Sequence, residues 1–242
     1  MASLEGIDVV VLAGGLGTRL RTVLGDRPKV LAPVGGRPFL DHLLARLAAE
    51  GAGRVILSLG HLAKSVLRHL ETGHQPLPVL ASVEPKPLGT AGAIRFVAAR
   101  LQGDPVLVMN GDTWLDCDFG AFLTAHRAAG RTASLLCVAV DDVERYGSVE
   151  VAADGSLARF VEKDPARSGR GLINGGIYLF SAAALDDLAR MPGPSLERDF
   201  LGLLPPGSIH AHVAAGAAFI DIGTPESLAA AAAVIARGTK ST

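Results

Sequence analysis

Short apolar runs alternate with amphipathic stretches through the first half of the chain. Residues 7–13 form an apolar run rich in valine, typical of a buried strand, and a glycine-rich turn follows it. In residues 39–50 the apolar positions recur at helical spacing, so one face of this helix should pack on a sheet. The alternation also predicts strands near residues 54–59, 79–83 and 105–109 and helices near residues 63–70 and 89–101. This order is typical of a Rossmann-like α/β fold, with a mostly parallel sheet and helices on both faces.

Strands become more closely spaced after about residue 140. Asp118 is the expected N-cap of a helix that ends near residue 129, and Thr224 is the expected N-cap of a closing helix over residues 225–236. Asp154 and Gly155 form a hairpin turn signal. Between these points we expect strands at residues 132–140, 148–152, 157–161, 172–179, 209–213 and 218–221, and a helix at residues 182–190. We therefore expect one domain over residues 1–242, in which an α/β half of about 140 residues precedes a strand-rich half.

The composition narrows the class of protein. Of the 242 residues, 49% are hydrophobic and 19% are charged, which suits a large buried core and excludes a disordered chain. The formal net charge of -1, from 23 basic and 24 acidic residues, lacks the positive excess of nucleic-acid or anionic-membrane binders. We expect small-molecule partners, no nucleic acid and no membrane, so any phosphate must be bound by local groups. The oligomeric state is left open, a homo-oligomer included.

Cysteine usage and the amino-terminal residues bear on the compartment. Cys117 and Cys137 form no CxxC pair, so neither a disulfide framework nor a structural zinc site is expected. The apolar run at residues 9–12 is too short for a signal peptide or a membrane span. We therefore expect a cytoplasmic protein.

A glycine-rich stretch follows the first expected strand. Residues 12–20 read Leu-Ala-Gly-Gly-Leu-Gly-Thr-Arg-Leu, and Arg27-Pro-Lys29 comes shortly after them. Glycine allows backbone N–H groups to approach an anion closely, and Arg19 and Lys29 would add positive charge to a polyphosphate site. Leu20 stands where the third glycine of the dinucleotide pattern G-x-G-x-x-G belongs, and the P-loop ending G-K-[ST] is absent. Neither a nicotinamide site nor a Walker-type site is therefore expected, and an ordinary tight turn is the alternative interpretation.

Two aspartates stand at the ends of expected strands that are far apart in the sequence. Asp112 follows the apolar strand in Val-Leu-Val-Met-Asn-Gly-Asp, and Asp221 ends a short strand before Ile-Gly-Thr-Pro. Open α/β sheets bind their ligands at the carboxyl ends of the strands, where Asp112 is placed for a metal ion. Taken singly, each aspartate could equally be a turn or helix cap.

These segments, in this order, resemble the sugar-1-phosphate nucleotidyltransferase family, whose signature is a glycine-rich loop with Thr-Arg and a later Pro-Lys. The resemblance extends from Val9 to Glu226 and implies the family's glycosyltransferase-A-like form of the Rossmann-like fold. It implies a nucleotide-binding half at about residues 1–140 and a sugar-binding half at about residues 141–242. The catalytic residues that it implies are Arg19, Lys29 and Lys163. The nucleotide-binding residues that it implies are Leu12, Ala13, Gly14, Gly15, Gly17, Thr18, Arg19, Glu84, Gly89 and Thr90.

The stretch Glu-Pro-Lys-Pro-Leu-Gly-Thr at residues 84–90 corresponds to the region that reads the nucleobase in this family. Glu84 matches the base-reading position. A carboxylate accepts hydrogen bonds from paired N–H donors such as those on the Watson–Crick edge of guanine, whereas uracil and thymine offer only one such donor. GTP is therefore the preferred nucleotide, and an exposed glutamate at a strand end is the alternative interpretation.

The resemblance also implies the metal and sugar-phosphate sites. It makes Asp112 and Asp221 the ligands of Mg²⁺, which takes one or two carboxylates together with phosphate oxygens and waters. Their carboxylates should then lie about 3–5 Å apart, or one rotamer change from that separation. The residues that it implies for the sugar phosphate are Asn110, Gly147, Glu162, Lys163 and Asn174, a mixture of acceptors, donors and one point charge that suits a polyol phosphate. A surface Glu-Lys pair and a turn-forming Asn-Gly are the alternative interpretation of the last three.

Within the family, residues 172–178 and 219–223 are most similar to the branch that makes GDP-activated D-glycero-D-manno-heptose. The implied reaction is a direct displacement in which D-glycero-α-D-manno-heptose 1-phosphate attacks GTP and releases pyrophosphate. Three alternatives remain open: a mannose-1-phosphate guanylyltransferase, an N-acetylmuramate 1-phosphate uridylyltransferase, and a non-catalytic subunit that senses sugar nucleotides.

Overall fold

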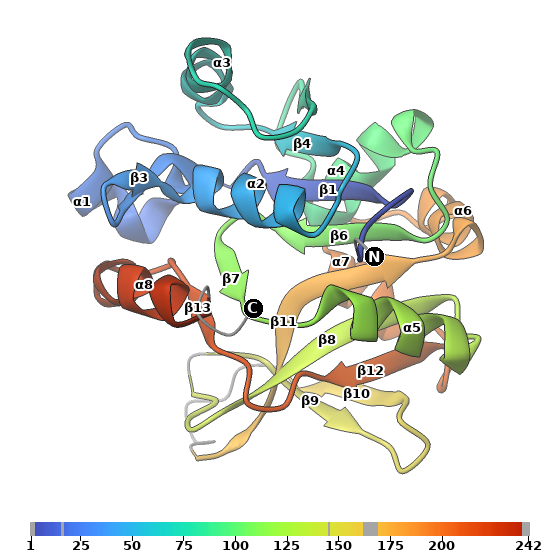
Figure 1. The fold of residues 1–242 in the computed structure, drawn as a ribbon. Helices are drawn as coiled ribbons and strands as arrows, with labels where there is room; N and C mark the ends of the chain where they lie inside the picture. Colours follow the sequence, from blue (N-terminus) through green and yellow to red (C-terminus); the bar gives the residue numbers. More distant parts are fainter. Residues whose placement is uncertain (1–2, 16, 145, 162–168, 239–242) are drawn as a thin grey trace.

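A computed structural model describes residues 3–15, 17–144, 146–161 and 169–238 of the chain (Figure 1). The strands up to residue 140 are β1 (Asp8–Ala13), β2 (Pro33–Val34), β3 (Arg37–Pro38), β4 (Val55–Leu59), β5 (Val79–Val83), β6 (Val106–Asn110), β7 (Thr113–Leu115) and β8 (Ala133–Val140). The α-helices of this part are α1 (Arg21–Leu24), α2 (Phe39–Ala49), α3 (Ala63–Thr72), α4 (Gly89–Val97) and α5 (Phe119–Ala129). Short 3₁₀ helices are η1 (Thr18–Leu20), η2 (Lys29–Leu31) and η3 (Ala98–Arg100).

The remaining elements follow residue 147. The strands are β9 (Ser148–Val151), β10 (Leu157–Val161), β11 (Gly171–Phe180), β12 (Ile209–Val213) and β13 (Phe219–Asp221). The helices are α6 (Ala182–Arg190), α7 (Leu196–Asp199), η4 (Leu201–Leu203) and α8 (Pro225–Gly238).

Strands β6, β1, β4 and β5 lie side by side in that order and run parallel. Val9 on β1 pairs with Leu107 on β6 and with Val55 on β4. Strands β1 and β4 are buried along nearly their whole length because helices cover both faces of the sheet, which explains their almost continuous apolar sequences. The predicted parallel α/β arrangement of the first half is therefore confirmed.

Strand β11 connects this parallel part to the strands of the second half. It runs antiparallel to β6 on one side and to β8 on the other, and near its start it pairs with β9. Strands β9 and β10 are antiparallel across the predicted turn at Asp154 and Gly155, and β12 runs parallel to β8. The result is one nine-stranded mixed sheet, with a strand-rich second half as predicted.

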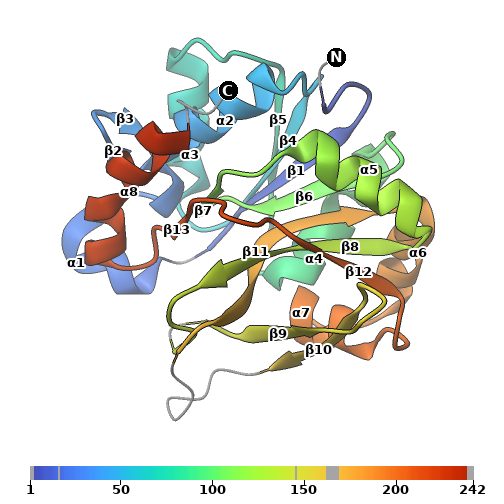
Figure 2. The ribbon, with the colours of Figure 1, turned by 60° about the horizontal axis from the view of Figure 1, so that its bottom comes forward.

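Helices cover the two faces of this sheet (Figures 1 and 2). Helices α2, α3, α5 and α8 contribute to the core on one face, and α4, α6 and α7 contribute to the core on the other. Neighbouring positions on β1 point to opposite faces, so Val9 and Val11 pack into the first core while Val10 packs into the second. All three side chains are fully buried, and each such burial stabilises the fold by about 1.5–3 kcal/mol.

Side-chain caps place the starts of three helices where the sequence predicts them. Asp118 accepts a hydrogen bond from the N–H three residues later at the start of α5, and Ser181 does the same for α6. Thr224 Oγ1 accepts from the backbone N–H of Ser227 in α8. Among the described residues, no helix is long and apolar enough to cross a membrane.

The sequence does not predict β7, a three-residue strand that begins just after Asp112. It pairs antiparallel with β13, so that Asp221 lies opposite Thr113. The backbone N–H of Ile222 also donates a hydrogen bond of 2.9 Å to the carbonyl of Asp112. This two-stranded ribbon therefore brings together two aspartates that are far apart in the sequence.

Arg46 on α2 anchors the ribbon to the rest of the fold. Its guanidinium lies 5.0 Å from the ring centroid of Trp114 and 4.9 Å from that of Phe119. It also donates to the carbonyls of Leu115 and Cys117. A cation between two aromatic rings stabilises by about 1–2 kcal/mol when it is desolvated, so α2 fixes the direction in which the chain leaves β7.

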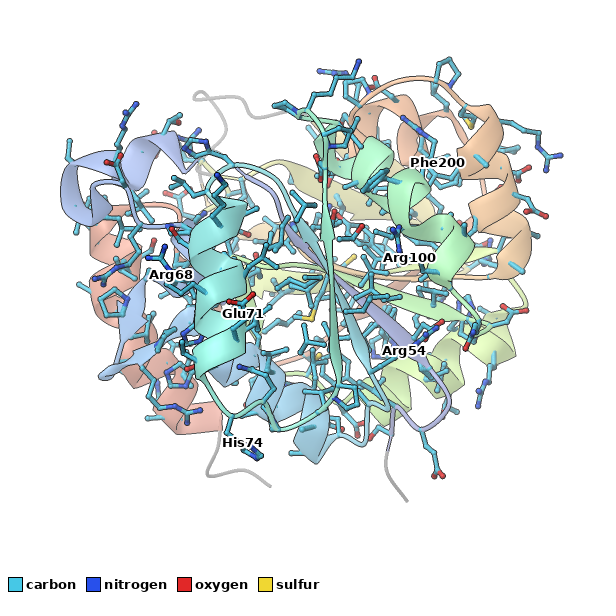
Figure 3. All side chains as sticks on the ribbon, turned by 90° about the horizontal axis from the view of Figure 1, so that it is seen from above. Arg54, Arg68, Glu71, His74, Arg100 and Phe200 are labelled. Atoms are coloured by element: carbon cyan, nitrogen blue, oxygen red, sulfur yellow. The ribbon has the colours of Figure 1, made fainter. Side chains whose placement is uncertain are left out.

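A second clamp lies at the amino ends of β1 and β4. The carboxylate of Asp8 accepts two hydrogen bonds from Arg54, of 2.7 and 3.0 Å, and others from the backbone N–H groups of Gln102 and Gly103. The backbone carbonyl of Arg100 accepts a further hydrogen bond from Arg54, and Figure 3 labels both residues. Burial alone would raise the pKa of Asp8, but the hydrogen bonds from Arg54 and from the two backbone groups outweigh it and hold this pKa below its usual range.

Candidate functional site

A cleft of about 340 Å³ opens at the carboxyl ends of β1, β5 and β6. The crevice beyond the carboxyl ends of parallel strands is where open α/β folds bind their ligands. Its lining residues come from four separate segments: Leu12, Ala13, Gly14, Gly15, Lys29, Val30, Glu84, Pro87, Gly89, Thr90, Ala93, Asn110, Gly111 and Asp112. Ten of the residues singled out from the sequence are therefore brought to one cleft: Leu12, Ala13, Gly14, Gly15, Lys29, Glu84, Gly89, Thr90, Asn110 and Asp112.

Lys29, Asp112 and Asp221 meet at the edge of this cleft. The Nζ atom of Lys29 lies 2.6 Å from Oδ2 of Asp112 and 4.0 Å from Oδ1 of Asp221. The side chain of Lys29 is 15% exposed, so its charge is only partly screened by solvent. The two predicted metal ligands thus share one ammonium group, and they do not point into separate regions of the molecule.

The donor set at this point suits a hard divalent cation. Asp112 and Asp221 supply two carboxylates, and their present cationic partner is Lys29. Mg²⁺ is held in proteins by one or two carboxylates and completes its shell with phosphate oxygens and waters. The described residues contain no group of three or more His, Cys, Asp or Glu side chains that could hold a metal ion. A cation at Asp112 and Asp221 would therefore need ligands from the substrate or from water.

The glycine-rich loop packs tightly against the end of β4. A Cβ atom on Gly60 would lie 2.8 Å from the carbonyl oxygen of Gly14, so the two backbones are in direct contact. Gly17 has a φ of +59°, a conformation that favours glycine. Close backbone packing and a left-handed turn are therefore the local reasons for glycine at these positions.

A second hollow of about 170 Å³ adjoins the cleft and shares Gly15 and Lys29 with it. Its lining also includes Gly17 and Thr18, two of the predicted nucleotide-binding residues, and the basic side chains of Arg21, Arg27 and His61. Arg19 lies on η1 between these residues, is exposed, and lines neither hollow. Arg27 belongs to the Arg-Pro-Lys stretch noted in the sequence, whereas Arg21 and His61 were not singled out there.

Glu84 lies at the end of β5 and faces the glycine-rich loop. Its Oε2 accepts a hydrogen bond of 3.0 Å from the N–H of Leu88, and its Oε1 accepts one of 3.1 Å from the hydroxyl of buried Ser58. A carboxylate has about four acceptor positions, so these two contacts orient the group and leave acceptor capacity for a ligand.

Gly89 and Thr90 begin α4 and contact the segment that precedes α7. Gly89 has a φ of +73°, and a Cβ atom there would collide with the carbonyl of Pro194. The hydroxyl of Thr90 accepts a hydrogen bond of 2.8 Å from the N–H of Leu196, and the N–H of Ala91 donates to the carbonyl of Pro194. Thr90 therefore has a structural role beside its predicted nucleotide contact.

Three of the residues predicted for the sugar phosphate are described, and one of them reaches the cleft. Asn110 lines it, and a Cβ atom on Gly176 of β11 would come within 2.6 Å of the side-chain nitrogen of Asn110. Asn174 precedes this contact on β11, and Gly147 precedes β9, whose Ser148 pairs with β11. Glu162 and Lys163 lie outside the described residues.

Some lining residues were not predicted. Val30, Pro87, Ala93 and Gly111 form the less polar part of the cleft wall, and Ser58 orients Glu84 from beneath. Each stands within three residues of a predicted residue except Ser58, whose only signal is a polar residue inside an otherwise apolar strand.

Burial raises the pKa of both cysteine thiols to about 12, so neither would be a thiolate nucleophile at neutral pH.

Comparisons with known proteins point to one family. A family model described as nucleotidyl transferase matches residues 8–238. The chain is 35% identical over 239 residues to mannose-1-phosphate guanylyltransferase of Mycobacterium tuberculosis, a match that covers 96% of this chain and 65% of that protein. The chain thus spans less than two thirds of the length of this relative.

Two further similarities span nearly the whole of the matched proteins. The chain is 31% identical over 225 residues to D-glycero-alpha-D-manno-heptose 1-phosphate guanylyltransferase of Aneurinibacillus thermoaerophilus, covering 91% of this chain and 94% of that protein. It also superimposes with a TM-score of 0.83 and 36% identity on HddC from Yersinia pseudotuberculosis complexed with GMP-PN, covering 94% of this chain and 98% of that one.

Proposed function

The chain belongs to the nucleotidyl transferase family, and on that premise we propose that it transfers GMP from GTP to a sugar 1-phosphate. The products are a GDP-sugar and pyrophosphate. The observation that carries the proposal is the convergence of Lys29, Asp112 and Asp221 at a cleft that the glycine-rich loop also lines. A small-molecule site of this kind fits the names of the relatives, which are sugar-1-phosphate guanylyltransferases.

The two adjoining hollows suggest how the nucleotide would lie. The base and ribose would occupy the larger cleft, where Glu84, Gly89 and Thr90 lie, and the outer phosphates would occupy the smaller one. Backbone N–H groups of the glycine-rich loop, with Arg19, Arg21 and Arg27 nearby, would offset the phosphate charge. Lys29 borders both hollows, so it would stand at the α-phosphate, between the base and the leaving group.

The chemistry needs positioning and charge neutralisation more than proton transfer. An oxygen of the sugar 1-phosphate would attack the α-phosphorus of GTP, and the bond from that phosphorus to the bridging oxygen would break to release pyrophosphate. Lys29 would neutralise charge on the α-phosphoryl group, and Lys163 would align the attacking phosphate. Asp112 and Asp221 would hold Mg²⁺, which supplies Lewis-acid charge neutralisation when bound.

Guanine is the base that the cleft favours. Each carboxylate oxygen of Glu84 already accepts one hydrogen bond, from Ser58 or from Leu88, and both donors belong to the protein. The remaining acceptor positions suit the two neighbouring N–H groups of guanine, and a pyrimidine with one such donor would leave one of them unpaired. The nucleotide analogue in the similar HddC structure is a guanine nucleotide, which supports this choice.

For the sugar we propose D-glycero-α-D-manno-heptose 1-phosphate, with mannose 1-phosphate as the second candidate. The first is named in the relative from Aneurinibacillus thermoaerophilus and the second in the relative from Mycobacterium tuberculosis. Asn110 on β6, Gly147 just before β9 and Asn174 on β11 would contact the sugar, together with Glu162 and Lys163. The two halves at residues 1–140 and 141–242 would then hold the nucleotide and the sugar respectively.

The test is a matrix of nucleoside triphosphates against sugar 1-phosphates with Mg²⁺, scored by pyrophosphate release and by the mass of the product. We expect a GDP-sugar from GTP, with heptose 1-phosphate ahead of mannose 1-phosphate, and no product in excess EDTA. Arg19→Ala should lower turnover strongly in the same assay.

Other outcomes would overturn parts of the proposal. Preference for UTP with N-acetylmuramate 1-phosphate would replace both substrates. Binding of a GDP-sugar without turnover of any pair would favour the sensing subunit.

A further inference from the structure

Strand β11 is interrupted opposite the cleft by a short bulge. Its pairing with β8 changes register between Asn174 and Tyr178, and Gly176 within the bulge has a φ of +70°. The carbonyl oxygen of the Asn174 side chain accepts a hydrogen bond of 2.8 Å from the N–H of Gly176. Gly176 in turn packs against the side chain of Asn110, which lines the cleft. The bulge therefore ties Asn174 to Gly176, the residue that packs against the Asn110 side chain in the cleft wall.

A chain of hydrogen bonds runs from Asn174 into the core. The amide nitrogen of Asn174 donates to the hydroxyl of Tyr178 at 2.8 Å, and that hydroxyl donates to Oε1 of Glu197 at 2.8 Å. An ionised carboxylate can only accept, so the single hydroxyl proton of Tyr178 must point to Glu197. The hydroxyl oxygen can then only accept from Asn174, which fixes the amide nitrogen on this side.

Tyr178 is fully buried, and its ring stacks on Phe180 with the centroids 5.8 Å apart. Phenylalanine would fill this space equally well, and a buried hydroxyl is costly unless its hydrogen bonds are satisfied. Burial and the neighbouring charge of Glu197 raise the pKa of Tyr178 well above its ordinary value, so the phenol stays neutral. Core packing alone therefore does not explain why residue 178 is tyrosine and not phenylalanine.

Glu197 is itself held in place from the nucleotide side of the molecule. It lies on α7, which is beside α4 (Figure 2), and the N–H of neighbouring Leu196 donates to the hydroxyl of Thr90. Arg95 on α4 donates to the carbonyls of Met191 and Gly193 in the segment before α7. The acceptor for Tyr178 is therefore fixed by a segment docked on α4, and its position does not depend on a mobile surface side chain.

We propose that Tyr178 and Glu197 are positioning residues for the sugar 1-phosphate, because they hold the Asn174 amide with one N–H and one carbonyl lone pair turned to substrate hydroxyls. Gly176 fixes the carbonyl end of that amide, and Tyr178 fixes the nitrogen end. The inference rests on the proposed function, since it assigns Asn174 to the sugar.

The test is steady-state kinetics of Tyr178→Phe, with the sugar 1-phosphate and GTP varied separately. Loss of one oriented hydrogen bond should raise KM for the sugar 1-phosphate by about three- to tenfold. KM for GTP should stay within about twofold, because Tyr178 is not among the residues that line the nucleotide cleft. Glu197→Ala should raise KM for the sugar 1-phosphate in the same way. Glu197→Gln should keep this KM close to that of the unaltered protein, because the side-chain carbonyl of glutamine can still accept from Tyr178.

A double-mutant cycle separates positioning from general stability. In an Asn174→Ala background, Tyr178→Phe should change KM for the sugar 1-phosphate by less than about twofold, since the residue that it positions is gone. Arg198→Ala, an exposed change on the same helix, is the matched control and should leave both KM values unchanged. Thermal unfolding of each variant verifies the fold, and if Tyr178→Phe fails to fold, Glu197→Ala carries the cycle.

The outcomes distinguish a failure of the positioning role from a failure of the proposed function. Equal rises in both KM values, or additive effects of Asn174→Ala and Tyr178→Phe, would overturn the positioning role while the guanylyltransferase stands. If the unaltered protein turns over no sugar 1-phosphate, the proposed function falls and the positioning role falls with it.

Discussion

At the scale of single residues, a substitution of Asp112 gives the most direct test of the proposed metal site. It accepts a hydrogen bond from Lys29 and lies beside Asp221 across the β7–β13 ribbon. Asp112→Asn keeps the shape but removes one of two carboxylates, so turnover with Mg²⁺ should fall by about two orders of magnitude. The measurement is kcat at saturating substrates, with circular dichroism to verify the fold.

Asp116→Asn is the control for this prediction, because Asp116 is a nearby carboxylate that pairs with Arg46 away from the cleft. It should retain most of the turnover. Near-normal activity of Asp112→Asn at ordinary Mg²⁺ concentrations would contradict the metal role of Asp112.

The proposed preference for guanine also rests on a single residue, Glu84. Glu84→Gln can still accept from Leu88 and contact Ser58, so the loop should keep its form. It loses one of the two acceptors that guanine needs, and kcat/KM for GTP should fall about 10- to 100-fold relative to UTP. A competition assay with both triphosphates measures this ratio directly.

Lys86→Ala changes an exposed charge in the same loop and should leave the preference for GTP unaltered. If Glu84→Gln also left the ratio of GTP to UTP turnover unaltered, Glu84 would be a loop clamp and not the base reader.

At the scale of elements, the Asp8–Arg54 clamp joins β1 to β4 and to the segment before β6. Asp8 is buried and its partner Arg54 is half-buried, so Asp8→Asn, which removes the charge but keeps an acceptor, should lower the free energy of unfolding at pH 7 by about 1–3 kcal/mol. Urea unfolding followed by circular dichroism measures this change.

The stability that Asp8 contributes should decrease as the pH falls. The pKa of Asp8 is lower in the folded protein than in the unfolded chain, so its contribution is complete above the unfolded value. It is lost as the pH falls through the lower, folded pKa, and the difference between the protein and Asp8→Asn should shrink below about pH 4. Asp141→Asn, which breaks the exposed pair with Arg170, should change stability little at any pH. A gap that stayed constant down to pH 2 would show that the ionised form of Asp8 is not what stabilises the fold.

At the scale of the whole molecule, ligand binding and stability are linked through the cleft. Its walls come from the residues around β1, β5 and β6 and from α4, so a nucleotide bound there would oppose unfolding of the sheet. At a GTP concentration about a hundredfold above Kd with Mg²⁺, stabilisation of about 2.7 kcal/mol should raise Tm by about 5–10 °C.

UTP at the same concentration is the control for this shift, and it should raise Tm less. A GTP-independent Tm in a calorimetric scan would contradict the assignment of the cleft to the nucleotide.

Most of the long elements were predictable because their hydrophobic patterns are local. The spacing of apolar residues in α2, the β-branched runs of β1 and β4, and the caps at Asp118, Ser181 and Thr224 each lie within a few residues of one another. The elements that were not predicted are short, such as β7, α1, α7 and the β2–β3 hairpin, and too few residues lie in each for a periodic pattern to emerge. Tertiary pairing determines them, as the pairing of β7 with β13 shows.

The candidate site residues could be named from the chain alone, because glycine spacing, a Thr-Arg and Pro-Lys pair and acids at strand ends are local features of the sequence. The contacts of Lys29 with Asp112 and Asp221, of Ser58 with Glu84, and of Tyr178 with Asn174 and Glu197 could be seen only in the folded chain. Each of these contacts joins residues brought together by strand order, register or the docking of α7 on α4. Sheet packing sets those distances, and no local pattern in the chain encodes them.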